Sequence, residues 1–113
     1  MLLHDLLGIR LVGDNSHYEG RVEVLNGGIW GTVCDDDWDL NDANVVCRQL
    51  GFEGTAFVNR RATFGGGTGK IWMKNVQCTG NETSLTECYH EGWGRRNCGH
   101  GQDVGVTCIP GNS

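Results

Sequence analysis

The chain has 113 residues and a net charge of −5 at pH 7, and it contains six cysteines, 19 glycines and one proline. A single domain of this size buries only a modest hydrophobic core, so we expect disulfide bonds formed in an oxidising, extracellular compartment to stabilise it. The acidic total argues against general nucleic-acid binding. Residues 1–56 carry ten acids and three bases, whereas residues 57–113 carry four acids and six bases, so a local basic face remains compatible with the sequence.

The first residues, MLLHDLLG, are apolar but are interrupted by His4 and Asp5. No basic segment precedes them and no cleavage site of small residues follows, so they predict neither a signal peptide nor a membrane span. We interpret residues 1–8 as a linker or cloning remnant, residues 9–109 as one domain and residues 110–113 as a C-terminal tail. Such a domain is expected to be one module of a larger secreted protein or receptor ectodomain.

The segment RVEVLNGGIWGTVC gives the strongest local signal of strands. Apolar residues alternate with polar ones, which is typical of half-buried strands. Asn26 and Gly27 tolerate the positive φ angles that a tight reversal of the chain requires. The sequence therefore predicts antiparallel strands at residues 21–25 and 29–34.

After these strands the apolar residues follow a helical period. One helical stripe contains Ala43, Val46, Cys47 and Leu50. We predict a helix over residues 41–50, with Asp39 or Asn41 as its N-cap and Gly51 just beyond its C-terminus.

Four further segments complete the prediction. Residues 64–70, FGGGTGK, read as a flexible loop without the spacing of a phosphate-binding loop. Residues 70–76 and 103–108 read as strands. Ser84 and Glu87 match a capping box at the start of a short helical turn.

The six cysteines include no C-x-x-C pair, so their spacing favours disulfides over a metal site but leaves the pairing open. Asn81, in Asn-Glu-Thr, is an acceptor for N-glycosylation in an exposed loop. None of the serines lies in a G-x-S-x-G motif, no cysteine is spare, and the histidines lack H-E-x-x-H spacing, so we predict no enzymatic activity.

Four blocks resemble the scavenger receptor cysteine-rich (SRCR) family: GRVEVLNGGIWGTVCDDDWD, ANVVCRQLGF, NVQCTGNETSLTEC and WGRRNCGHGQDVGVTC. The resemblance implies a compact α+β domain, in which a curved antiparallel sheet cradles one helix. It also implies the six-cysteine subgroup, group A, with the pairs Cys34–Cys98, Cys47–Cys108 and Cys78–Cys88.

The aspartates after Cys34 do not form an EF-hand loop, because Leu40 and Val46 occupy its glycine and glutamate positions. In the SRCR family, two aspartates after this cysteine join a glutamate near the C-terminus to hold calcium or magnesium. The matching positions are Asp35, Asp36 and Gln102. Glutamine at the third position removes one formal charge, so the resemblance implies a weakened site for Ca²⁺ or Mg²⁺. Asp103 is adjacent, but we expect it to point to the opposite face.

Basic residues form a second candidate site for polyanionic ligands, since arginine pairs bidentately with phosphate, sulfate or carboxylate. The candidates are Arg60, Arg61, Arg95, Arg96 and Lys70, with Lys74 as a further neighbour. The alternative is that they serve only as solubilising surface charge.

The segment VEVLNGGIW also matches a bacteria-binding pattern of the SRCR family, which assigns Val22, Glu23, Val24, Leu25 and Trp30 as contact residues. The valines and Trp30 look like core positions of the hairpin. Only Glu23 and the turn at residues 26–28 are expected to be freely exposed.

Taken with the resemblance, these features predict an extracellular, non-catalytic module of innate-immune pattern recognition. We expect it to bind polyanionic or microbial-surface ligands, such as lipopolysaccharide or sulfated glycans, with help from a divalent cation. No specific reading of nucleic-acid sequence and no insertion into a membrane are expected. The alternatives are a protein–protein adhesion module and an accessory domain of a secreted enzyme.

Overall fold

The computed structural model describes residues 7–13, 16–94 and 98–109, without the side chains of 54–56. The predicted C-terminal tail and most of the predicted linker lie outside these residues. The elements are β1 (Ile9–Val12), β2 (Glu19–Asn26), β3 (Ile29–Val33), α2 (Leu40–Gln49), β4 (Gly54–Asn59), β5 (Lys70–Met73), β6 (Gly105–Ile109) and the 3₁₀ helices η1 (Leu85–Glu87) and η2 (His100–Gln102).

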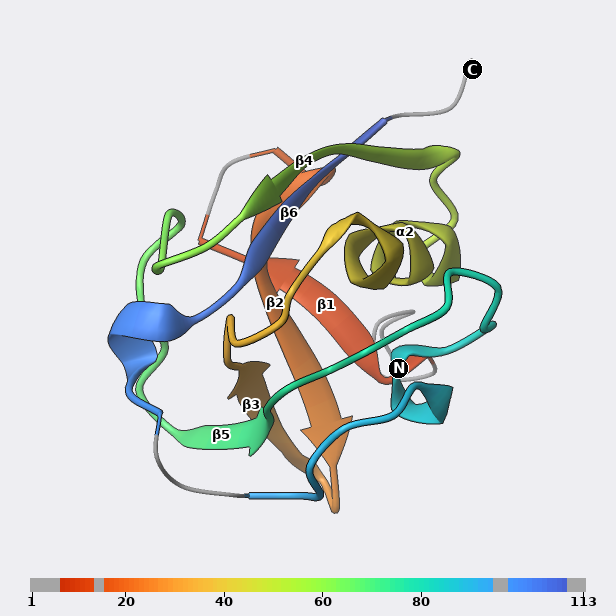
Figure 1. Cartoon of the computed structure of the whole chain (residues 1–113). Coiled ribbons are helices and arrows are strands. Elements are labelled where there is room, and N and C mark those ends of the chain that lie inside the picture. The colour runs from red at the N-terminus through yellow and green to blue at the C-terminus, as the bar shows by residue number, and fades with distance from the viewer. Residues whose placement is uncertain (1–6, 14–15, 95–97, 110–113) are drawn as a thin grey trace.

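The strands form one curled sheet in the order β4-β6-β2-β3-β5, and β1 also pairs with β2 (Figure 1). β2 pairs with β1 along one edge and with β6 and then β3 along the other. The pairs are antiparallel except for β3 and β5, which run parallel with Gly31 opposite Lys70. The predicted α+β fold, with one helix on a curved sheet, is confirmed, but the sheet contains this one parallel pair because the long connection from β3 through α2 and β4 returns the chain in the same direction.

The hairpin between β2 and β3 confirms the strands predicted on either side of Asn26. Its turn residues Gly27 and Gly28 have φ angles of 61° and 82°. A side chain would be strained at both angles, so glycine permits the tight reversal. β2 begins two residues earlier than predicted, at Glu19.

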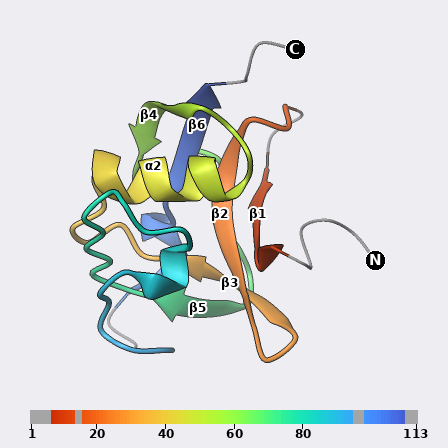
Figure 2. The same cartoon turned by 90° about the vertical axis from the view of Figure 1, so that its right-hand side faces the viewer.

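Helix α2 also confirms its prediction, beginning one residue earlier than expected. Asp39 caps its N-terminus, and Asp42 accepts a hydrogen bond from the Asp39 N–H in return. Gly51, with a φ of 94°, ends the helix. The helix packs on β4 and β6 (Figures 1 and 2) and buries its predicted apolar stripe except Leu50, which is only half-buried.

Three local predictions differ from the structure. Strand β4 was not predicted, because its sequence GTAFVN has no clear alternation. β5 ends at Met73, and Asn75 turns the chain with a φ of 54°. The capping box predicted at Ser84 is absent: the Ser84 side chain makes no cap hydrogen bond, and Glu87 instead accepts from the N–H and hydroxyl of Thr83.

The hydrophobic core lies between the helix and the sheet, and all six cysteines are paired around it. The disulfides are Cys34–Cys98, Cys47–Cys108 and Cys78–Cys88, the same pairs that the family resemblance implies. Within the described ranges, no helix is long and apolar enough to cross a membrane.

Candidate functional sites

A hollow of about 290 Å³ lies between the strands β1 to β3 and the glycine-rich loop. Its lining includes three cationic side chains and one carboxylate, and we call it the basic hollow. These charged residues are Arg10, Arg21, Lys70 and Glu23. The three positive charges and one negative charge give the hollow a net charge of about +2.

Glu23 is 6% exposed, so the prediction that it is freely exposed is wrong. Its Oε1 accepts hydrogen bonds from Nε and Nη2 of Arg10 at 3.0 and 2.7 Å, and its Oε2 accepts one from Nε of Arg21 at 3.0 Å. The cause is the register of β1 against β2, which places Arg10 directly opposite Glu23. Sequence reasoning missed both arginines: Arg10 meets Glu23 only through this strand pairing, whereas Arg21, two residues before Glu23, lies on the same face of β2 by strand alternation, a local signal that was not used.

Trp30 forms part of the wall of the basic hollow. The guanidinium of Arg10 stacks on its indole, with Cζ 4.2 Å from the ring centroid. Val22 and Val24 of the predicted bacteria-binding motif are buried, while Leu25 and Trp30 are half-buried. Most of this motif therefore belongs to the core or to the wall of the hollow.

The loop at residues 64–70 approaches the rest of the domain closely at two positions, which explains Gly66 and Gly67. A Cβ on Gly67 would lie 2.8 Å from Cγ2 of Thr32, and one on Gly66 would lie 2.9 Å from the His100 carbonyl oxygen. The Gly67 N–H donates to Oδ2 of Asp103 at 2.7 Å. The loop is therefore anchored, and it forms one side of the basic hollow.

His100 links this loop to the buried Asp103. Its Nδ1 lies 2.9 Å from Oδ2 of Asp103, and its Nε2 lies 2.9 Å from the Gly69 carbonyl oxygen. Burial alone would lower the pKa of His100, but hydrogen bonds to Asp103 and Gly69 raise it above its ordinary value. Among the described hydrogen bonds, the Asp103 side chain contacts Gly67 and His100 and neither Asp35 nor Asp36, in line with the predicted opposite orientation.

The structure brings Asp35, Asp36 and Gln102 together. The Asp35 N–H donates to the Gln102 carbonyl oxygen at 2.8 Å, which sets the two segments side by side. Nε2 of Gln102 donates to Oδ1 of Asp35 at 3.2 Å and to Oδ1 of Asp36 at 3.4 Å. We call these three residues the acidic cluster.

Three of the four carboxylate oxygens of the acidic cluster accept a hydrogen bond from the chain, and the fourth, Oδ2 of Asp36, forms an ion pair. The Arg61 N–H donates to Oδ2 of Asp35 at 2.9 Å, and Nζ of Lys74 lies 3.7 Å from Oδ2 of Asp36. The Gln102 amide presents its donor group, and calcium or magnesium requires oxygen ligands. As arranged, these residues do not fit a divalent cation. Lys74, paired with Asp36, also does not join a free basic face.

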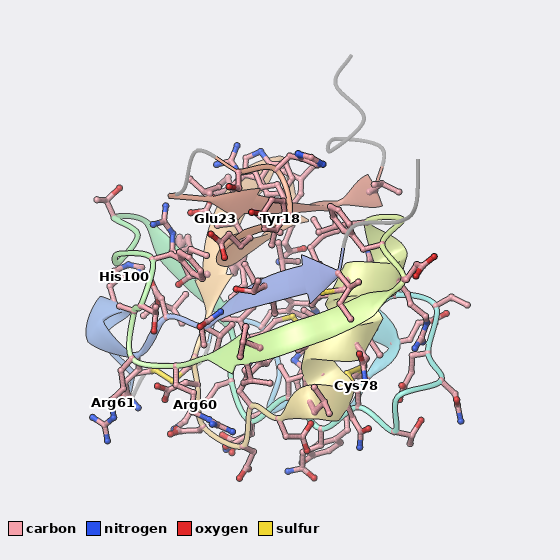
Figure 3. All side chains as sticks on the ribbon, turned by 90° about the horizontal axis from the view of Figure 1, so that it is seen from above. Tyr18, Glu23, Arg60, Arg61, Cys78 and His100 are labelled. Carbon is pink, nitrogen blue, oxygen red and sulfur yellow. A yellow bond between two sulfur atoms is a disulfide. The ribbon has the colours of Figure 1, made fainter. Side chains whose placement is uncertain are left out.

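Of the predicted basic residues that the structure describes, the two arginines lie apart from Lys70. Arg60 and Arg61 follow β4 next to the acidic cluster, where Arg60 Nη2 donates to the Trp38 carbonyl oxygen. In Figure 3 they extend outward on the opposite side of β4 from Glu23. Lys70 lines the basic hollow, while Arg95 and Arg96 lie outside the described residues.

Two more surface features are relevant to binding. A groove of about 530 Å³ beside β5 is lined by residues that include Ile29, Trp72 and Lys70. Trp93 packs edge-on against Trp72, with 6.3 Å between the ring centroids, and is 43% exposed.

Asn81 is exposed in the loop closed by the Cys78–Cys88 disulfide, and its glycosylation remains a prediction.

Known proteins resemble this chain along most of its length. Residues 12–109 match the family model for the scavenger receptor cysteine-rich domain. The third SRCR domain of murine neurotrypsin is 50% identical with a TM-score of 0.82, and the match covers 92% of this chain and 97% of that one. The SRCR domain of mouse MARCO, solved in a dimeric form, is 46% identical with a TM-score of 0.75 and coverages of 88% and 92%. Domain III of CD5, a group B scavenger cysteine-rich receptor, is 27% identical with a TM-score of 0.56, and the match covers 88% of this chain and 91% of that one.

Proposed function

This chain belongs to the scavenger receptor cysteine-rich family, and from that premise we propose that it is a non-catalytic recognition module for anionic groups on polyanions or microbial surfaces. SRCR domains are extracellular recognition or adhesion modules of secreted proteins or membrane receptors. Sulfated glycans and lipopolysaccharide carry the anionic groups that such a module would bind.

The basic hollow is the observation that supports this function best. Its excess of positive charge attracts an anion, and its concave shape partly shields that attraction from water. Arg10 is held by Glu23 on one side and by the indole of Trp30 on another. A guanidinium held in this way loses little conformational freedom on binding, which favours affinity for sulfate, phosphate or carboxylate groups.

Heparin binding to the 113-residue chain tests the proposal. Lys70→Ala removes a charge that no described salt bridge uses, and we expect heparin affinity to fall several-fold, up to about tenfold. Arg48→Ala is the matched control, because Arg48 lies in the last turn of α2 and donates to the Glu82 carbonyl oxygen. Affinity should also fall steeply with ionic strength. Equal heparin affinities for the two variants would contradict the proposal.

A double variant, Arg60→Ala/Arg61→Ala, tests the arginines that the sequence predicted. If this variant alone loses heparin affinity, the anionic ligand binds next to the acidic cluster. If Lys70→Ala alone loses affinity, the ligand occupies the basic hollow.

The groove beside β5 supports a second candidate, a protein–protein adhesion module. Ile29 and Trp93 are 50% and 43% exposed, and large exposed apolar residues of this kind are common in protein interfaces. A partner bound there would be released by Ile29→Ala, because Ile29 lines the groove, and would be little affected by salt. The salt dependence of binding therefore distinguishes the two functions.

A further inference from the structure

The acidic cluster is closed by positive or donor groups that belong to the chain itself. We propose that Gln102 and Lys74 take the place of the divalent cation in this chain, so that residues 34–38 keep their folded conformation without calcium or magnesium. The proposal does not depend on the basic hollow, because it concerns the response to cations in the absence of any anionic ligand.

Lys74 is a fixed part of this arrangement. Its side chain is only 13% exposed, and its ammonium lies 3.7 Å from Oδ2 of Asp36. The parallel pairing of β5 with β3 brings Lys74 to this position, since the Cys34 N–H donates to the carbonyl oxygen of the neighbouring Met73 at 2.9 Å. A positive charge held at this distance already neutralises one carboxylate, so a divalent cation would be repelled by it.

Gln102 is the second group that replaces the cation. Its amide nitrogen bridges Oδ1 of Asp35 and Oδ1 of Asp36, which relieves the repulsion between two neighbouring carboxylates. To bind a cation through its carbonyl oxygen, the Gln102 amide would have to rotate. It would then lose both hydrogen bonds to the aspartates and gain only one contact between a neutral oxygen and the cation.

The charge count points in the same direction. Two carboxylates and one ammonium give the cluster a net charge of −1, whereas glutamate at position 102 without a lysine at 74 would give −3. Calcium affinity increases with the number of charged oxygen ligands. The two residues therefore weaken the site by different means, one by removing a ligand charge and the other by adding a positive charge.

The backbone already holds this segment without a cation. The Asp35 N–H donates to the Gln102 carbonyl oxygen at 2.8 Å, the Trp38 N–H donates to the Asp35 carbonyl oxygen at 3.1 Å, and Cys34 is joined to Cys98. These contacts fix the conformation of the turn, so a cation would have little left to organise.

Thermal denaturation and calorimetric titration with calcium chloride and magnesium chloride test the proposal. The wild-type chain should melt at the same temperature in EDTA and in millimolar calcium or magnesium, and it should give no saturable heat of binding. The double variant Gln102→Glu/Lys74→Met should gain calcium affinity by at least about tenfold and melt at a higher temperature with calcium. Asn81→Asp adds a carboxylate in the Cys78–Cys88 loop instead and should stay unresponsive.

Several results would overturn the proposal. The first is a melting temperature that rises with calcium or magnesium in the wild type but not in the Asp36→Ala variant. Another is a folded double variant that gains no calcium response; if that variant does not fold, Lys74→Met alone must show the gain. Gln102→Met provides an independent measurement, because loss of the bridging amide should lower the melting temperature in EDTA. An unchanged temperature would show that the amide does not hold the carboxylates together.

Discussion

Oε1 of Glu23 accepts a hydrogen bond of 2.7 Å from Nη2 of Arg10 and so joins strands β2 and β1. The same carboxylate pairs with Arg21 through its other oxygen. One buried acid therefore has two effects: it stabilises the pairing of the strands, and it reduces the positive charge that the basic hollow presents to a ligand.

These two effects predict opposite changes on Glu23→Gln. The free energy of unfolding should fall by about 2 kcal/mol, because the buried network loses its negative charge and one of its two acceptor oxygens. Heparin affinity should rise, because the hollow gains one net positive charge while Trp30 and the remaining glutamine oxygen still hold Arg10. Chemical denaturation and a binding titration measure the two quantities. Glu53→Gln removes an exposed acid, so it controls for net charge and should change neither quantity appreciably. If Glu23→Gln lowered both stability and heparin affinity, this account of the hollow would be contradicted.

Val24 tests whether the VEVL segment is a contact surface or a part of the core. Its side chain is 1% exposed, so Val24→Ala leaves a cavity and should lower the free energy of unfolding by about 2 kcal/mol. The folded variant should bind heparin as tightly as the wild type does. Denaturation curves together with binding at low temperature check both expectations. Unchanged stability with lost binding would instead support a direct contact of Val24 with ligand.

The long-range and short-range disulfides should contribute unequally to stability. Cys47–Cys108 links α2 to β6 across 61 residues, whereas Cys78–Cys88 spans 10. Loop-closure entropy gives roughly 4 kcal/mol for the first bond and roughly 3 kcal/mol for the second. The pairwise alanine variants, compared by denaturant unfolding, should therefore lose stability in that order. A larger loss from the Cys78 and Cys88 pair would mean that local structure in its loop outweighs chain entropy.

Local signals in the sequence predicted the elements that local interactions determine. The turn at Asn26 and Gly27, the Asp39 cap and the glycine at position 51 each depend on residues within a few positions of one another. The strand direction of β5 depends on how a long connection returns to β3, and no periodicity within β5 encodes it. The sequence therefore predicted where β5 begins but not which way it runs beside its neighbour.

The sites were harder to predict for the same reason. Arg10 and Glu23 are 13 positions apart and meet only through the register of two strands. Alternation places Glu23 and Arg21 on the same outer face of β2, but it could not show that Arg10 of β1 also covers that face. The cluster of Asp35 with Gln102 came from the family resemblance, whereas the ion pair of Asp36 with Lys74 requires the structure.

Asp42 provides a pH-dependent test of the helix N-terminus. Its carboxylate is fully buried and accepts hydrogen bonds from the Cys78 N–H at 2.7 Å and the Asp39 N–H at 2.8 Å. Burial raises the pKa of Asp42 from 3.8 to about 7, although these two hydrogen bonds oppose the shift.

The sign of the pH effect follows from this raised pKa. Between pH 4 and pH 7 the folded chain holds a proton on Asp42 that the unfolded chain has released, so the contribution of Asp42 to the free energy of unfolding falls as pH rises through this range. Asp42→Asn has no proton to release there and loses this contribution to the slope. The free energy of unfolding is measured against pH for both proteins, and the wild-type value is subtracted from the variant value at each pH, which removes the contributions of the other titrating groups. This difference should increase from pH 4 to pH 7 and then stay constant. Parallel curves across this range would mean that the two backbone donors keep Asp42 ionised in the folded protein.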